Sequence, residues 1–433
     1  MLKYILIIAT FTVTTASNSL ELLKEDIQKI VDLHAEAYNA TFSVAIRGSS
    51  LGEDPLAFSS GDFGVTTHTN FAWGSITKMW TGASIMQLVA RGKIQMKQKI
   101  SPIVDPILKK MKESAFSNMN FSSLSDLYGK DVDTVTIENL LAMQSGIPDF
   151  DTANPSRTGP DLDPFRANVY ANPTENFSEP TLMSLPWVAT HNLTSKPGTG
   201  FHYSSTNFGI LGLIVASFYG HDKNYMEYDQ SSFLNNIPSL EGVKNSIRWA
   251  VTGSPKQFDV IPGFDRTTYN GQNPSDGGVN VVDVAGVFAG YSAADFVGSP
   301  SDVAMLGYAL WGNESLLVPS EYRDLMVPSS REFYGLASQN VGLMGIAGGD
   351  DEYSVAYGHL GATYGYDSIF AYNPTLDVGI AIASNIETST QTQPSAAFCA
   401  VYNRVRNYLL NEEPQVCTYV TEGYYGGTCT CYN

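Results

Sequence analysis

The chain has 433 residues, 43% of them hydrophobic and 12% aromatic, which is enough to build a large packed core. Its formal net charge at pH 7 is −18, so nucleic acid and anionic lipid would repel it and are not expected as partners. After the N-terminal segment no stretch reaches 18 consecutive apolar residues, so no stable membrane insertion is expected.

Residues 1–17, "MLKYILIIATFTVTTAS", have the form of a secretory signal peptide. Lys3 gives a positive start, a mostly apolar run follows, and small residues suit a cleavage site. The alternative is a buried N-terminal helix. We therefore expect a secreted protein, or one of the secretory-pathway lumen. Five N-x-S/T sequons are weak support for this route and predict a glycoprotein: Asn39, Asn120, Asn176, Asn192 and Asn313.

The first predicted elements are a helix over 20–38 and a strand over 42–48, with a second strand within 56–64. A helix then begins near Ser75 and runs to about Arg91, where Gly92 ends it.

The middle of the chain predicts mainly helices. Residues 134–150 hold a short helix that ends at Gly146 and Pro148. Residues 150–200 are rich in Pro, Asn, Asp and Thr and predict a long ordered loop or insertion. Residues 205–220 predict a strongly apolar helix.

The last third changes character. Residues 353–360 and 367–385 alternate like strands, with "NPTLD" as a hairpin turn, and 394–413 predicts a final helix. The simplest fold is α/β (α+β): one antiparallel sheet built from both chain ends, flanked by the terminal helices, with a mostly helical region inserted. The predicted division is a signal peptide (1–17), one domain (18–412) and a cysteine-containing C-terminal tail (413–433). Within the domain, the sheet part covers about 20–75 and 290–412, and the helical insertion covers about 76–289.

All four cysteines lie near the C-terminus, at Cys399, Cys417, Cys429 and Cys431. An even number in a secreted chain predicts two disulfides, with three possible connectivities. Because Cys429 and Cys431 are too close to pair comfortably, each is expected to reach back to Cys399 or Cys417. The clustering indicates a pinned tail, and a metal site is disfavoured because no histidine lies near.

Two serine motifs invite a catalytic interpretation. "GSSLG" at 48–52 matches G-x-S-x-G with Ser50 at its centre, but that motif must join a strand to a helix. Here a proline and a second strand-like run follow, so a hairpin loop is the better interpretation.

The second motif is Ser75-Ile-Thr-Lys78, the single S-x-x-K of the chain. Residues three apart share a helix face, so the lysine can reach the serine, whose N-terminal position favours a developing alkoxide. The alternative is a helix cap followed by a surface lysine.

The surrounding blocks favour catalysis. "FAWGSITKMWTGASIMQLVARGKI", "TIENLLAMQSGIPDF", "PGTGFHYSSTNFGILGLIVA" and "YGHLGATYGYDSIFAYNPTLDVGIAIASN" resemble, in order, the blocks of the serine β-lactamase/DD-peptidase superfamily, nearest its class C β-lactamase-like branch. The resemblance spans about residues 22–411. It implies that fold and a cofactor-free serine hydrolase that forms an acyl-enzyme on a small-molecule or peptide substrate, an amide or ester, as β-lactamases, D-Ala-D-Ala carboxypeptidases and esterases do.

The resemblance assigns roles to three residues of the acylation step. Ser75 matches the nucleophile, Lys78 the adjacent base or proton relay, and Tyr203 the tyrosine of the Y-x-N motif. Acting as a base would need a lowered pKa at Tyr203, which we expect Lys78 to provide. The alternative for Tyr203 is a structural aromatic residue before a helix.

The third block matches the K-T-G or H-x-G element at His359, Leu360 and Gly361. The resemblance implies that His359 tunes the proton network across the cleft and that Gly361 lets the substrate approach. It also implies an oxyanion hole formed by the N–H groups of Ala362 and Ser75. Taken alone, His359 would be read as a satisfied core histidine.

Two positions depart from the pattern. Ser205 stands where the asparagine of Y-x-N is usual, with Asn207 near by, and Leu360 replaces a threonine or serine. Since Leu360 offers no donor for a free carboxylate, penicillins and free-carboxylate peptides are expected to be poor substrates. The alternative function is a catalytically inactive binding protein that keeps the fold. No metal-binding motif is present in the sequence.

Overall fold

The computed structural model describes residues 19–151, 163–220, 228–269, 277–328, 332–344, 352–389, 391–412, 421–422 and 428–429. Its centre is a six-stranded antiparallel sheet in the order β2-β1-β11-β10-β9-β8. The strands are β1 (Phe42–Gly48), β2 (Leu56–Ser60), β8 (Gln339–Asn340), β9 (Tyr357–Thr363), β10 (Tyr366–Asn373) and β11 (Val378–Ser384).

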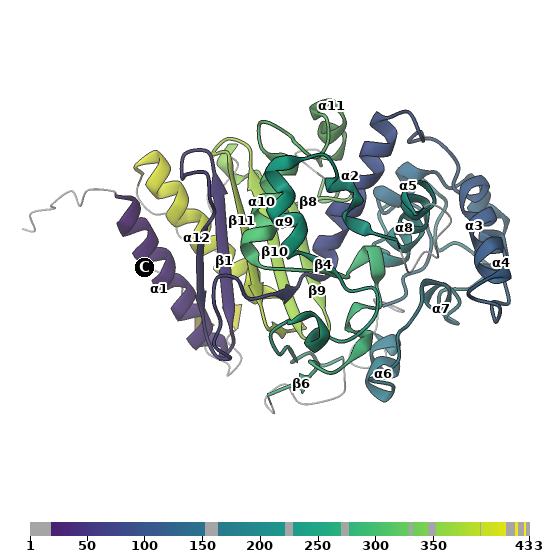
Figure 1. The fold of residues 1–433 in the computed structure, drawn as a ribbon, viewed down its shortest axis with the longest axis horizontal. Coiled ribbons are helices and arrows are strands. Elements are labelled where there is room, and N and C mark those ends of the chain that lie inside the picture. The colour runs from purple at the N-terminus through teal and green to yellow at the C-terminus, as the bar shows by residue number, and fades with distance from the viewer. Residues whose placement is uncertain are drawn as a thin grey trace, which may run out of the picture.

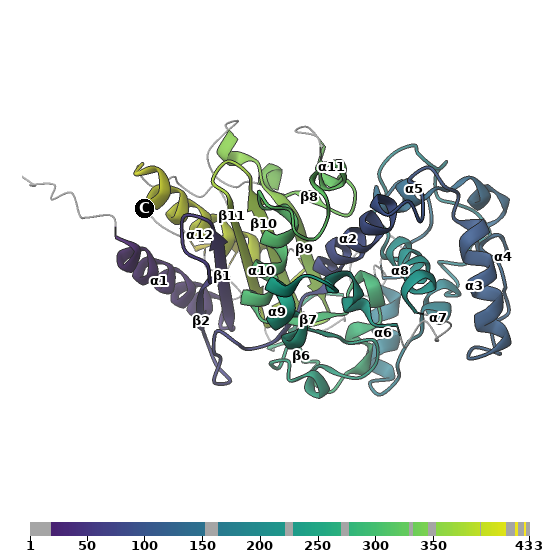
Figure 2. The ribbon, with the colours of Figure 1, turned by 45° about the horizontal axis from the view of Figure 1, so that its top comes forward.

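The sheet is built from both ends of the chain, as predicted. β1 pairs with β11 in a register that joins Phe42 to Ser384. On one face lie α1 (Leu20–Tyr38) and α12 (Thr392–Leu410), which pack against each other, and α10 (Pro300–Trp311) lies on the other (Figures 1 and 2). Every residue of β10 and β11 is buried, since both faces of these strands are covered.

Most of the remaining helices form the second part of the molecule, while α9 lies beside α10 and α11 lies near β8 (Figure 2). The remaining helices are α2 (Thr77–Ala90), α3 (Ser101–Glu113), α4 (Leu124–Tyr128), α5 (Ile137–Leu141), α6 (Pro164–Ala171), α7 (Glu179–Met183), α8 (Ser205–Tyr219), α9 (Glu241–Ser246) and α11 (Ser320–Arg323). α2 and α8 contact each other and are buried along most of their length, which their continuous apolar sequences favour.

Three small sheets complete the described fold. Two are three-stranded, with the orders β3-β7-β4 and β12-β5-β6, and one is the pair β13-β14. Their strands are β3 (Phe71–Ala72), β4 (Arg248–Trp249), β5 (Phe264–Asp265), β6 (Val279–Asn280), β7 (Phe296–Gly298), β12 (Ile386–Glu387), β13 (Thr421–Glu422) and β14 (Thr428–Cys429).

Two predicted boundaries were wrong. α5 is a five-residue helix that begins after its N-cap Thr136 and ends at Leu141, before Gly146. The strand predicted from residue 353 begins at Tyr357, because Glu352–Ser354 form a 3₁₀ turn. The segment 150–200, predicted as a long ordered loop or insertion, contains the short helices α6 and α7. Ser50 is exposed in the turn between β1 and β2, and no helix follows it, so the hairpin interpretation is confirmed.

The predicted leader and most of the tail lie outside the described residues. Cys399 is buried in α12 and disulfide-bonded, and Cys429 belongs to β14. Cys417 and Cys431 are not described, so the two-disulfide arrangement stays a prediction. The asparagines of all five sequons are exposed, as glycosylation requires, but glycosylation also stays a prediction. Within the described ranges, no helix has the length and apolarity needed to cross a membrane.

Candidate active site

Ser75 sits in a tight helical turn that contacts the sheet. The turn is a 3₁₀ segment, Gly74–Ile76, which leads directly into α2. Gly74 has φ 51°, and a Cβ atom there would lie 2.3 Å from the carbonyl oxygen of Ala362 in β9. Only glycine therefore fits at this position. Because Gly74 has no Cβ atom, the backbone of the turn that carries Ser75 can lie directly against the edge of β9.

Ser75, Lys78 and Tyr203 converge. Nζ of Lys78 lies 2.8 Å from Oγ of Ser75, one helical turn away, and the hydroxyl of Tyr203 donates to the same Oγ at 3.0 Å. Lys78 is fully buried, and its Nζ also donates to the carbonyl oxygen of Ala293 at 3.1 Å. A surface lysine next to a helix cap would not be enclosed in this way, so the structure favours the catalytic interpretation.

Burial shifts the pKa values of the two candidate bases, Lys78 and Tyr203, in opposite directions. It lowers the pKa of Lys78 to about 8, against the opposing pull of Asp151 and Asp149. It raises the pKa of Tyr203 well above its ordinary value, and the hydrogen bond to Ser75 does not compensate. The lowered tyrosine pKa expected from the sequence is therefore wrong, because burial penalises the phenolate and the charges of Asp151 and Asp149 raise the pKa further. Lys78 is the group that can change its protonation near neutral pH.

His359 is held neutral in one tautomer. Its Nδ1 lies 2.5 Å from the carbonyl oxygen of Leu360, which can only accept, so Nδ1 carries the proton. Its Nε2 then accepts a hydrogen bond from the hydroxyl of Tyr334 at 3.2 Å. Burial and the charge of Lys78 lower the pKa of His359 to about 3. The ring centroid of His359 lies 6.2 Å from that of Tyr203. His359 is therefore a neighbour of the candidate proton-transfer groups.

The N–H of Ala362 points toward the turn that carries Ser75. β9 and β10 are joined by two residues, which makes Thr363 and Tyr366 a hydrogen-bonded pair and Ala362 and Asp367 a non-hydrogen-bonded one. The N–H of Leu360, two residues earlier, points outward to the side chain of Gln339, and Ala362 shares that direction. This orientation is the one that an oxyanion hole with Ser75 requires.

The structure corrects the roles expected of Gly361 and Leu360. A Cβ at Gly361 would lie 2.1 Å from the carbonyl oxygen of Trp73, so the close approach that this glycine permits is that of Trp73 and not of a substrate. The side chain of Leu360 is half-buried against the core beneath α1 and α12, opposite Ile369, on the far face of the sheet. It does not line the pocket of Ser75, so it does not block a carboxylate there.

The carboxyl group of Asp149 lies next to Ser205, a contact that the sequence did not predict. Ser205 is the first residue of α8, and its backbone N–H donates to Oδ1 of the buried Asp149 at 2.8 Å. Asn207 points elsewhere, since its side chain accepts from Ser145 at 2.7 Å. Asn207 therefore does not replace the missing asparagine of Y-x-N.

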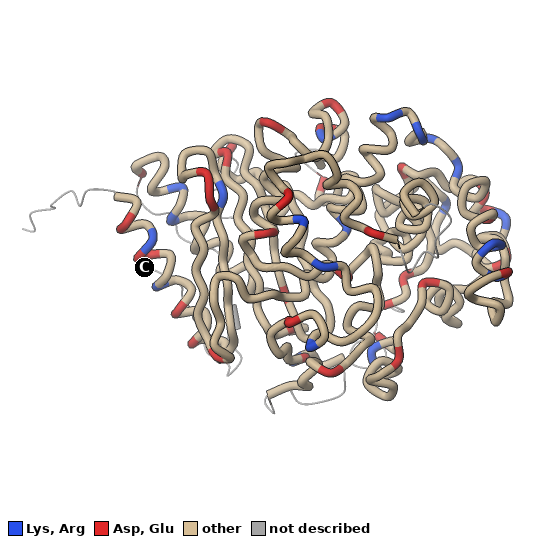
Figure 3. The backbone as a smooth tube through the Cα atoms, in the orientation of Figure 1, with Lys and Arg blue, Asp and Glu red and all other residues tan. Residues whose placement is uncertain are grey.

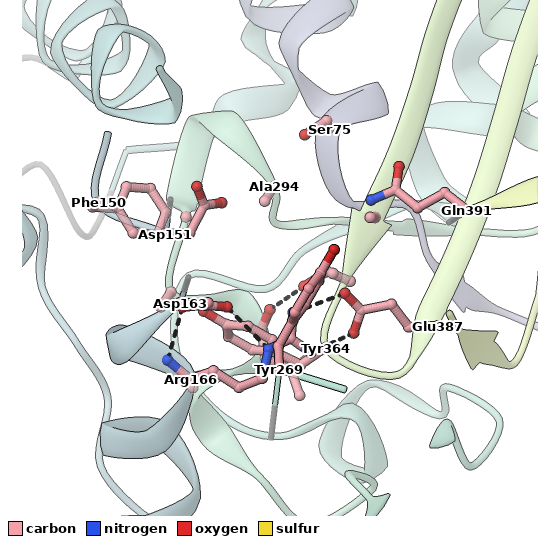
Figure 4. A pocket seen from close by; sticks show the side chains of 16 residues that line it. Ser75, Phe150, Asp151, Asp163, Arg166, Tyr269, Ala294, Tyr364, Glu387 and Gln391 are labelled. Atoms are coloured by element: carbon pink, nitrogen blue, oxygen red, sulfur yellow. Dashed lines mark hydrogen bonds and ion pairs between the residues drawn. The ribbon is translucent and has the colours of Figure 1, made fainter. Parts of the chain in front are cut away.

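A pocket of about 310 Å³ opens beside Ser75 (Figure 4). Ser75 and Asp151 lie at one end, Arg166 and Glu387 at the other. Arg166 is buried among Asp163, Asp265 and Glu387, and its guanidinium lies 4.5 Å from the ring centroid of Tyr364 and 5.4 Å from that of Tyr269. These groups come from four separate segments of the chain.

Sequence reasoning missed Asp149, Asp151, Arg166, Tyr334 and Glu387, because no motif connects them. The available signal was "SGIPDFD", where Asp149 lies inside a recognised block and Asp151 directly follows it. Among the residues that the structure describes, no group of three His, Cys, Asp or Glu side chains is placed to hold a metal ion.

The Beta-lactamase family model matches residues 50–234, a range that includes Ser75, Lys78 and Tyr203. The protein flp of Staphylococcus aureus strain N315 is 23% identical over 325 residues, which cover 74% of this chain and 53% of that protein. The chain therefore spans about half the length of the curated relatives it matches.

Solved structures share the fold. A D-stereospecific amidohydrolase from Streptomyces sp. superposes with a TM-score of 0.61 and 19% identity, covering 87% of this chain and 98% of that one. A D-amino acid amidase from Ochrobactrum anthropi SV3 gives 0.63 and 17%, covering 89% and 99%. A penicillin-binding protein from Bacillus halodurans gives 0.56 and 19%, covering 88% and 100%. The family model therefore matches the segment that holds Ser75, Lys78 and Tyr203, and the solved structures show that this chain has a β-lactamase/DD-peptidase-like fold.

Proposed function

We propose that the chain is a serine hydrolase that cleaves an amide or ester through an acyl-enzyme on Ser75. One observation carries the proposal: Oγ of Ser75 lies within hydrogen-bond distance of both the buried amine of Lys78, at 2.8 Å, and the hydroxyl of Tyr203, at 3.0 Å. An enclosed lysine whose pKa is about 8 is neutral in about a tenth of molecules at pH 7, and that form accepts a proton.

In the acylation step, Oγ of Ser75 bonds to the substrate carbonyl carbon while its proton passes to the neutral amine of Lys78. The carbonyl oxygen becomes negative and accepts from the N–H groups of Ser75 and Ala362. The scissile C–N or C–O bond then breaks, and the leaving group takes a proton from the hydroxyl of Tyr203, which regains one from the ammonium of Lys78. In the second step water attacks the ester carbon and gives a proton to the neutral amine of Lys78. The bond between that carbon and Oγ of Ser75 then breaks, Oγ takes this proton, and the acid is released.

The test is covalent labelling with a fluorophosphonate probe. Wild-type protein is expected to be labelled, and Ser75→Ala to lose the label while keeping its circular dichroism spectrum. The matched control is Ser50→Ala, which removes the exposed serine of the G-x-S-x-G sequence and should leave labelling unchanged. Equal labelling of wild type and Ser75→Ala would reject Ser75 as the nucleophile.

The second candidate is an inactive binding protein that keeps this fold, favoured by Ser205 in place of an asparagine. An unlabelled wild type, with neither ester nor amide hydrolysis, would support it.

We also propose that the chain follows the secretory route. Secretion should remove residues 1–17, and N-terminal sequencing of the exported protein tests this.

A further inference from the structure

We propose that the ion pair between Arg166 and Glu387 is a positioning device for catalysis: it holds the turn of the β9–β10 hairpin and, through that turn, the N–H group of Ala362. The inference rests on the proposed hydrolase function, in which that N–H group supplies half of the oxyanion hole. Arg166 and Glu387 are positioning residues in this scheme, because they act on the reaction through the hairpin.

The ion pair belongs to a buried cluster. Charged residues are spread over the whole molecule (Figure 3), but Asp163, Arg166, Asp265 and Glu387 are buried together at the end of the pocket away from Ser75 (Figure 4). Arg166 donates from one terminal nitrogen to Oε2 of Glu387 at 2.7 Å and from the other to Oε1 at 2.8 Å. This paired contact fixes the direction of the carboxylate as well as its position.

The same carboxylate binds the hairpin turn. β9 and β10 are joined by Tyr364 and Gly365, and the N–H of Gly365 donates to Oε2 of Glu387 at 3.1 Å. The ring centroid of Tyr364 lies 4.5 Å from the guanidinium of Arg166. Both residues of the turn therefore contact the ion pair, one through its backbone and the other through its ring.

The turn is held from other sides as well. The carbonyl oxygen of Gly365 accepts from the N–H of Phe264 in β5 at 3.1 Å, and the hydroxyl of Thr363 donates to the carbonyl oxygen of Val287 at 2.6 Å. Gly365 has φ 85°, and a Cβ atom there would lie 2.6 Å from Cγ2 of Val281. The turn thus fits closely between its neighbours, so the carboxylate of Glu387 meets it in one defined place.

Ala362 lies two residues before the turn. The residue opposite Ala362 on β10 is Asp367, whose Oδ2 accepts from the N–H of Thr388 at 3.0 Å, next in the chain after Glu387. Both strands at this end of the hairpin are therefore attached to the segment that contains Glu387. An oxyanion donor works only at about 2.7–3.1 Å from the developing charge, so a small shift of the hairpin would weaken the hole formed with Ser75.

Glu387→Gln tests the ion pair, because it removes the negative charge that binds Arg166 and changes the size of the side chain little. For a small neutral ester, kcat is expected to fall by about tenfold to a hundredfold, the effect of displacing a reacting geometry by up to about 1 Å. KM should stay within about threefold, because the lost interaction is made in the transition state. A higher KM with unchanged kcat would make Glu387 a substrate-binding residue and overturn the inference.

A thionoester of the same structure reports on the oxyanion hole directly. Its sulfur is larger than the carbonyl oxygen and accepts hydrogen bonds more weakly, so a well-placed pair of N–H groups favours the oxygen ester. The ratio of kcat/KM for the oxygen ester to kcat/KM for the thionoester should fall by about tenfold in Glu387→Gln. A merely less stable protein would lose both rates alike. An unchanged ratio would therefore overturn the inference.

A second variant keeps the test independent of how well Glu387→Gln folds. Thr363→Val removes only the hydroxyl bond to Val287 and should lower the same ratio by about threefold. The matched control is Asp26→Asn, which removes a carboxylate that binds Arg404 between α1 and α12 at 2.9 Å. It should leave kcat and the ratio unchanged, and an equal fall in this control would contradict a specific effect of the hairpin contacts.

Hydrogen exchange measured by mass spectrometry separates this inference from the hydrolase function. In Glu387→Gln, the amides of residues 357–366 should exchange about tenfold faster than in the wild type, while those of 42–48 should not change. Unchanged exchange of the hairpin in a protein that takes the fluorophosphonate label would overturn the inference and leave the hydrolase function standing. A wild type that takes no label would reject the hydrolase function and with it the role in the oxyanion hole.

Discussion

The hydroxyl of Tyr334 donates a hydrogen bond of 3.2 Å to Nε2 of His359, while Nδ1 of that histidine faces the carbonyl oxygen of Leu360. Both ring nitrogens are therefore occupied in the neutral state. A proton added to Nε2 would break the bond from Tyr334 next to the ammonium of Lys78. This relationship separates His359 from the groups that titrate during catalysis.

The pH profile should accordingly belong to Lys78. We expect kcat/KM for an uncharged ester to rise about tenfold per pH unit on the acid side and to level near pH 8, because the neutral amine is the base and the pKa of Lys78 is about 8. Asp151→Asn removes a charge that raises the pKa of Lys78, so the rise of kcat/KM on the acid side of the profile should move to lower pH. A rise of kcat/KM centred near pH 6.5 would instead indicate that a histidine with an ordinary pKa is the base.

The imidazole of His359 should remain neutral across that range, since its pKa is about 3. Proton NMR of the histidine rings between pH 5 and 8 checks this, with His359→Gln used to assign the signal. A His359 resonance that titrates in this window would contradict the tautomer described above.

Leu360 should have little influence on substrate choice. Its side chain packs on the far face of the sheet, so Leu360→Thr should change the ratio of kcat/KM for benzylpenicillin and a neutral ester by less than about threefold, or under ~0.7 kcal/mol. A larger shift toward the penicillin would restore Leu360 as the selector that the sequence suggested.

Glu179 should make the protein less stable as the pH rises. Burial raises its pKa to about 8, and its Oε1 lies buried without a hydrogen-bond partner in the described structure. The folded state then holds a proton that the unfolded state releases above its pKa of 4.5. Stability contributed by the neutral form is present below pH 4.5 and is lost progressively up to pH 8, at ~1.4 kcal/mol per pH unit at most.

Urea unfolding at pH 5 and pH 8 measures this loss. Glu179→Gln should lose less stability between the two pH values than the wild type, whereas Glu175→Gln, at an exposed position nearby, should behave like the wild type. Equal pH dependence in all three proteins would show that Glu179 is hydrated in solution.

On the secretory route proposed above, we expect the four cysteines to be oxidised. Two disulfides at ~2–4 kcal/mol each would stabilise the folded state, while their reduction should change kcat/KM little, since Cys399 lies in α12 and does not line the pocket of Ser75. Titration of free thiols under denaturing conditions is the measurement. Four reactive thiols would contradict the arrangement.

Local sequence patterns were enough to predict the main helices and strands. The 3.6-residue period of α1, the apolar run of α8 and the hairpin of β10 and β11 can each be recognised within one continuous segment. So can the spacing of Ser75 and Lys78. The polar wall of the pocket was not predictable, because Asp151, Arg166 and Glu387 meet only after folding. The tyrosine pKa was missed for a related reason: burial depends on neighbours that are distant in sequence.

The pairing of Phe42 with Ser384 also sets an order in which the candidate site can assemble during synthesis. β1 leaves the ribosome long before β11, and most of its residues are apolar ones that are buried in the folded chain. β1 must therefore remain unpaired with β11 until the chain has been made past Ser384. Ser75 and Lys78 can already be neighbours on the nascent chain, but β9, whose edge lies against the turn of Ser75, is made much later. The nascent chain thus carries the candidate nucleophile long before the other groups of the candidate site can join it.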